Sequence, residues 1–78
     1  MSALAEKLAD KLAADVIAHV EATGDEDMIK IMGTALGDSS QTLQEAFITS
    51  VRVQRAALRA QELLRRRIAE HAAAKVDD

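Results

Sequence analysis

The sequence predicts an all-α fold, in which two shorter helices pack on a long third helix and oligomerisation completes the helical bundle. Three observations favour this fold class. Apolar residues recur at helical spacing along the chain. Proline is absent and glycine occurs only three times, and the segment 41–74 contains no glycine. We therefore expect helices at about 3–22, 26–36 and 41–74 in a single helical domain, 1–78, whose tail frays from about residue 75.

The first helix is expected to begin after Ser2, whose hydroxyl can accept a hydrogen bond from a backbone N–H of the first turn. Its apolar side chains form one stripe, which we expect to be buried. This stripe consists of Ala5, Leu8, Ala9, Leu12, Ala13, Val16 and Val20. Thr23 and Gly24 then end the helix.

The second helix is expected to begin in the acidic run Asp25–Asp27, because negative charge in a first turn complements the helix dipole. Gly37 is expected to close it in the left-handed conformation. Gly33, in its middle, costs up to about 1 kcal/mol relative to alanine. We attribute that glycine to the close approach of another backbone. The inner face is expected to consist of Met28, Ile29, Met32, Ala35 and Leu36.

The third helix organises the chain, because it would be about 50 Å long. Asp38, Ser39 or Ser40 can cap its start. One apolar line on it contains Leu43, Phe47, Val51, Leu58, Ile68, Ala72 and Val76, with Gln54 and Gln61 inside the line. A second line, a quarter-turn away, contains Ala46, Val53, Ala57, Ala60 and Leu64. Together they cover about half of the helix circumference, so the helix needs more than one partner helix.

Two arrangements of the helices fit these lengths. In one, the two short helices lie end to end along the long helix, with a kink at Thr23 and Gly24. In the other, the second and third helices form a hairpin, and the half of the long helix beyond about Leu58 pairs with a second subunit. Both arrangements are all-α bundles.

A homo-oligomer, with a dimer favoured, is expected because the isolated core would be thin. Alanine makes up much of the apolar content, Phe47 is the single aromatic residue, and there is no cysteine to form a disulfide. The expected oligomer or partner interface consists of Phe47, Val51, Gln54, Leu58, Gln61, Leu64 and Ile68. Gln54 and Gln61 lie one heptad apart. Either they form hydrogen bonds across an oligomer axis, or this part of the helix is only partly covered.

Charge is distributed unevenly along the chain. Residues 1–27 contain two lysines and seven acidic residues, a formal charge of −5, whereas residues 52–67 contain six arginines and one glutamate, a formal charge of +5. A possible face for an anionic partner consists of Arg52, Arg55, Arg59 and Arg66. This face predicts nucleic-acid binding as an alternative function. Glu62 among the arginines and the lack of further aromatic residues for base stacking argue against it.

No catalytic or metal-binding constellation is evident, so we expect neither an enzyme nor a cofactor or metal. His19 follows Asp15 at helical spacing, and we expect the two to form a structural pair. The serines have no neighbouring histidine or nucleophile motif. No apolar run is long enough to span a bilayer, and the N-terminus lacks the pattern of a signal peptide. These features predict a cytoplasmic location.

The sequence therefore predicts a small, non-catalytic helical protein that acts as an interaction, adaptor or regulatory protein through helix–helix contacts. Its partner is expected to be another protein as well as a second copy of the chain. The alternative is a small nucleic-acid-binding regulator that uses the basic face between Arg52 and Arg67.

Overall fold

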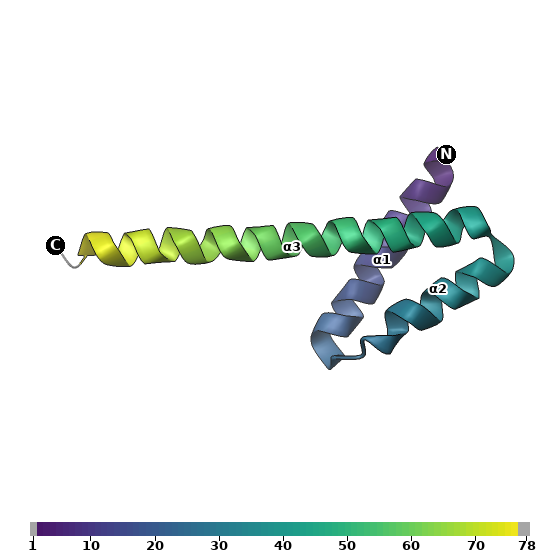
Figure 1. Ribbon diagram of the computed structural model, residues 1–78, viewed down its shortest axis with the longest axis horizontal. Coiled ribbons are helices and arrows are strands. Elements are labelled where there is room, and N and C mark those ends of the chain that lie inside the picture. Colours follow the sequence, from purple (N-terminus) through teal and green to yellow (C-terminus); the bar gives the residue numbers. More distant parts are fainter. Residues whose placement is uncertain (1, 77–78) are drawn as a thin grey trace.

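The computed structural model describes residues 2–76, and these form three α-helices without any strand. The helices are α1 (Ala3–Thr23), α2 (Asp27–Ser39) and α3 (Gln41–Val76). Both shorter helices pack on the first half of α3, and the second half projects away from them (Figure 1). The expected all-α fold, with two short helices on a long third, is confirmed. The expected frayed tail falls partly outside the described residues, since α3 continues through Val76.

The α2 and α3 helices form a hairpin. Near the start of α2, Glu26 forms an ion pair with Arg55 of α3, at 2.6 Å. Farther along α2, the carbonyl of Gly33 accepts a hydrogen bond from the Gln44 side chain, at 2.8 Å. The two helices therefore run antiparallel, while α1 crosses the same half of α3 on another side (Figure 1). Of the two expected arrangements, the structure contains the hairpin and not the end-to-end one.

The core lies where α1 crosses α3. Phe47 is completely buried and belongs to one apolar cluster with Ala9 and Ala13 of α1, which are also completely buried. Alanine side chains allow the two helices to approach closely, so the phenyl ring is enclosed despite the small number of large residues. Val16, Val20 and Val51 complete the buried cluster. This stripe of α1 was expected to be buried, although its Leu8 is exposed.

The caps of α1 agree with the sequence. The Ser2 hydroxyl accepts a hydrogen bond from the Ala5 backbone N–H, at 3.2 Å. Gly24 adopts the left-handed conformation, with φ of 76°, and its N–H donates to the Val20 carbonyl. A residue with a Cβ would be strained at this φ, which is why glycine ends the helix.

The expected end of the second helix at Gly37 is wrong. Gly37 is inside α2, which continues to Ser39, and Gly24 is the only residue from 2 to 76 with positive φ. The chain turns at Ser40, whose backbone is extended and whose N–H donates to the Leu36 carbonyl. Its hydroxyl accepts a hydrogen bond from the Leu43 N–H, at 3.1 Å. A single extended serine therefore both ends α2 and caps α3, without a left-handed residue.

The expected backbone approach at Gly33 is wrong as well. No atom from outside its own helix backbone lies within 4 Å of the place that a Cβ at Gly33 would occupy. The tight position is Gly37, where a Cβ would overlap the amide group of Gln44. Gly37 thus leaves room for the side chain that bonds the Gly33 carbonyl and fastens α2 to α3.

Replacing Gly33 by alanine is expected to raise the free energy of unfolding by about 0.5–1 kcal/mol, because alanine favours the helix and the added methyl meets nothing. Gly24→Ala is the matched comparison and is expected to lower it by about 1–2 kcal/mol, because its φ is positive. Chemical denaturation at one protein concentration measures both values. Destabilisation by Gly33→Ala would contradict the finding that there is room for a methyl group at this position.

Candidate functional site

The projecting half of α3 is the most conspicuous surface of the molecule. Every residue from 56 to 74 is exposed. Large aliphatic side chains are among them: Leu58, Leu63, Leu64 and Ile68 are 44–66% exposed. Both short helices lie beside the first half of α3 (Figure 1), and the end of α1 comes near the start of the second half, where Glu21 lines a shallow hollow with Leu58 and Arg59. Apolar side chains at helical spacing with no neighbouring helix are characteristic of a helix–helix interface.

The chain exposes much more surface than a compact chain of its mass. Its accessible surface is 5978 Å², whereas a compact 8.4 kDa monomer exposes about 4,600 Å². Its radius of gyration is 16.9 Å, against about 11.5 Å for a compact domain of this length. The excess area exceeds the share of about 800 Å² that one partner contributes to a stable protein interface.

One strip of α3, which we call the seam, has the alternating three- and four-residue spacing of a coiled-coil interface. It consists of Ala46, Ser50, Val53, Ala57, Ala60, Leu64, Arg67 and His71. From Val53 onward all its residues are exposed, with Val53 at 62% and Leu64 at 60%. Ala57 and Ala60, at its centre, are small enough to let another helix approach closely.

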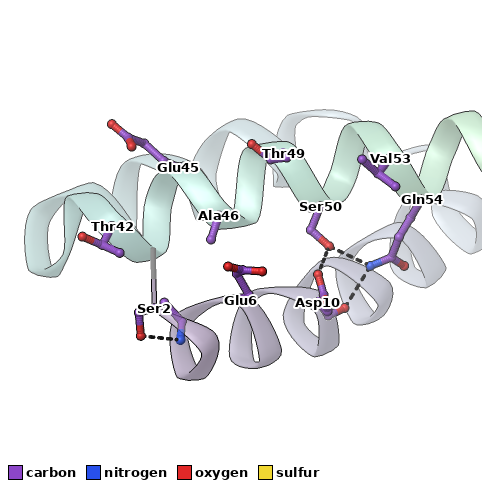
Figure 2. A pocket seen from close by; sticks show the side chains of 11 residues that line it. Ser2, Glu6, Asp10, Thr42, Glu45, Ala46, Thr49, Ser50, Val53 and Gln54 are labelled. Carbon is purple, nitrogen blue, oxygen red and sulfur yellow. Dashed lines mark hydrogen bonds between the residues drawn. The ribbon is translucent and has the colours of Figure 1, made fainter.

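A groove of about 660 Å³ lies between α1 and the first half of α3 (Figure 2). Ala5, Glu6 and Asp10 line it from α1, and the seam residues Ala46 and Val53 line it from α3. Because the seam continues from this groove onto the projecting half, the groove and the exposed helix form one continuous surface. Figure 2 shows Glu6 directed from α1 into the space below Ala46 and Thr49.

A polar network closes one end of the groove and ties α1 to α3 (Figure 2). The buried Ser50 hydroxyl donates to the Asp10 carboxylate, at 2.6 Å. The Gln54 amide donates to the Ser50 oxygen and to the Asp10 backbone carbonyl, each at 3.0 Å. This network was not predicted from the sequence, although Gln54, a polar residue inside the apolar line, was an indication of such a contact.

The expected interface residues fall into two groups. Phe47 and Val51 belong to the core of the single chain, and the half-buried Gln54 is engaged in the network with α1. Hydrogen bonding within one chain accounts for Gln54, so it does not need an oligomer axis. The remaining four lie exposed on the projecting half: Leu58, Gln61, Leu64 and Ile68. The second group is therefore the part of the predicted interface that is exposed in the single chain.

The arginines expected to face an anionic partner divide in a similar way. Arg55 donates to Glu26 at 2.6 Å, and this hydrogen bond raises the pKa of the Arg55 guanidinium. Arg66 lies 3.7 Å from Glu62. Arg52 and Arg59 are both on the exposed surface of α3, with Arg59 on the projecting half.

Carboxylates of α3 itself accompany the basic residues of the projecting half. Arg65 donates to Glu62 at 2.6 Å, and this hydrogen bond lowers the pKa of the Glu62 carboxyl. Arg67 lies 3.5 Å from Glu70. These pairs reduce the positive potential that a phosphate backbone would meet. Nucleic-acid binding at this face stays a prediction from the sequence.

The expected pairing of His19 with Asp15 is wrong. The His19 Nε2 atom lies 2.9 Å from Asp25, while Asp15 forms an ion pair with Lys11 at 3.0 Å. The turn at Gly24 reverses the chain and brings Asp25 back to the last turns of α1, which helical spacing alone does not indicate. Across residues 2–76, no three His, Asp or Glu side chains gather where they could hold a metal ion.

None of the three helices, over the part of the chain that the structure covers, combines the length and the apolar character needed to cross a membrane. Comparisons with models of protein families, with curated proteins and with solved structures found no match for the chain. Function must therefore be inferred from the groove, the seam and the projecting half of α3.

Ser50→Ala is expected to lower the free energy of unfolding by about 1–2 kcal/mol, because it removes the buried hydroxyl that forms hydrogen bonds with Asp10 and Gln54. The control is Thr49→Ala, an exposed neighbour on the same helix, which is expected to change it by less than about 0.5 kcal/mol. Urea denaturation followed by circular dichroism measures the difference. Equal effects of the two substitutions would show that the network contributes no stability.

Proposed function

We propose that the chain is a non-catalytic helical interaction protein that acts as a homodimer, in which the projecting half of α3 supplies the interface. Such a dimer would work as an adaptor or regulatory protein by presenting helix surfaces to another protein. The observation that carries this proposal is the row of exposed aliphatic side chains on the seam and beside it, chiefly Leu64 and Ile68.

The energetics of an uncovered helix support the proposal. Most of the stability of a helix in a protein comes from the packing of its apolar face on other elements. Only one end of the projecting segment, near Ala56, is attached to the packed part of α3. Packing Leu64 and Ile68 against a second helix would bury apolar area and stabilise the segment, at about 25 cal/mol for each Å².

A second copy is a suitable partner because the chain carries complementary charge. Residues 1–27 have a formal charge of −5, and the arginines are concentrated in α3. One symmetric contact can therefore bring opposite charges of the two copies together. The attraction between these charges also speeds the encounter of the two copies. We do not extend the proposal to nucleic acid, because Arg55, Arg65 and Arg67 already contact the carboxylates of Glu26, Glu62 and Glu70.

Leu64→Asp is expected to weaken the dimer by at least about 100-fold in dissociation constant, because a carboxylate would enter the interface in both copies. Leu63→Asp is the matched control: Leu63 is next in sequence and 66% exposed, against 60% for Leu64, but it lies outside the seam. It is expected to change the dissociation constant by less than about threefold.

Sedimentation equilibrium of the wild type and both variants measures these constants, and circular dichroism checks that helicity is kept. Two outcomes contradict the proposal. One is a wild-type chain that stays monomeric at tens of micromolar, a concentration range typical of weak dimers. The other is a Leu64→Asp variant that associates as tightly as the wild type.

A further inference from the structure

We infer that the two copies pair with their α3 helices antiparallel, Ala57 of each against Ala60 of the other, so that each projecting half enters the groove between α1 and α3 of the second copy. This inference rests on the proposed function, because it specifies the arrangement of the same dimer. It assigns an occupant to the groove, namely residues 64–71 of the second copy.

The seam itself fixes the register. It begins at Ala46 and ends at His71. In an antiparallel pair, each first core position of a heptad on one helix faces a second core position on the other. Only one such register uses the whole seam, and it pairs Ala46 with His71, Ser50 with Arg67, Val53 with Leu64, and Ala57 with Ala60. The contact is symmetric, so both seams are covered by one two-fold operation.

This register covers the exposed apolar side chains of the seam with one another. Val53 and Leu64, 62% and 60% exposed in one copy, face each other twice in the dimer. Ile68 lies one turn farther along α3 than Leu64, so it arrives level with Thr49 and Ser50 of the second copy, which line the groove. The alanines at the centre set a close approach of the two helices, and that approach brings the larger side chains on either side into contact.

Charge selects the antiparallel orientation over the parallel one. The ionisable residues that line the groove are all acidic: Glu6, Asp10 and Glu45. Residues 59–71 contain four arginines and two glutamates, a formal charge of +2. Antiparallel pairing brings the basic segment of one copy to the acidic groove of the other. Parallel pairing would place arginines beside arginines and one acidic groove beside the other, which like-charge repulsion disfavours.

Arg67 is the residue that meets the acidic groove most directly. In this register it faces Ser50 of the second copy, whose hydroxyl is bonded to Asp10. Glu6 lies one helical turn before Asp10 and is directed into the same space (Figure 2). Within its own helix Arg67 lies 3.5 Å from Glu70, and both side chains are exposed. Because exposed ion pairs contribute little stability, Arg67 can exchange this contact for one with Glu6 at small cost.

Disulfide trapping tests the register, because the chain has no cysteine of its own. Ala57→Cys and Ala60→Cys variants are oxidised separately and as an equimolar mixture, and the products are identified by mass spectrometry. We expect the mixture to form the 57–60 disulfide at least about tenfold faster than either variant links to itself, because only the facing Cα atoms lie within the bonding range of about 7 Å.

Faster linkage of the Ala57→Cys variant to itself would indicate a parallel pair and overturn the inference. A wild-type dimer in which neither variant nor the mixture forms a disulfide would indicate a different interface and overturn it too. Sedimentation of the wild-type chain shows separately whether a dimer exists. A wrong register is thereby distinguished from a wrong proposed function.

Charge exchange tests the contact with the groove. Glu6→Arg and Arg67→Glu are each expected to weaken the dimer roughly tenfold, because each places like charges together twice in the symmetric pair. The double variant is expected to return to within about threefold of the wild-type dissociation constant. The control is Arg59→Glu combined with Glu6→Arg, which is not expected to restore binding, since Arg59 lies outside the seam. A Glu6→Arg and Arg67→Glu double variant weaker than either single variant would overturn the contact.

Discussion

The structure depends on the packing of Phe47 against two alanines of α1. The chain has one aromatic side chain, and it is completely buried in one cluster with Ala9 and Ala13 of α1. Because the other buried members of this cluster are alanines and valines, the core cannot extend far from this crossing. The three helices therefore pack around the first half of α3, and the position of Phe47 decides which half is covered.

The exposure of the second half of α3 follows from this position of the core. The 36-residue helix contains no glycine or proline to end it, so it would continue for about 54 Å. The 21 residues of α1 and the 13 of α2 would suffice to line much of it. The turns at Gly24 and Ser40 instead fold both helices against the same half. Leu64 and Ile68 are thus exposed because of topology.

Helical periodicity, the absence of proline and the cap at Ser2 were enough to predict three helices and their order. The turn at Gly24 was also predictable, since a glycine that follows an apolar stripe commonly ends a helix. The prediction for Gly37 was wrong because a glycine can either end a helix or leave room for a neighbouring side chain. Here it makes room for the Gln44 side chain, and Ser40 makes the turn instead. The contact between Gly37 and Gln44 joins two helices, so the spacing of residues within one helix does not predict it.

The candidate surface was only partly predictable for a similar reason. The sequence identified Leu58, Leu64 and Ile68 as apolar positions that one chain does not cover, and these are exposed in the structure. It could not separate them from Phe47, which shares their face of the helix, because the separation arises from where α1 crosses. The groove likewise requires α1 and α3 to be placed together, so neither helix contains it alone.

Hydrogen exchange measured at several protein concentrations tests the central claim most directly, because it reports on residues 56–74 in the unaltered chain. If a second copy covers this segment, its amides should become more protected as the concentration rises through the dimer dissociation constant, while amides around Phe47 change little. Rapid exchange of this segment that does not depend on concentration would show that no second copy covers it, and would contradict the account.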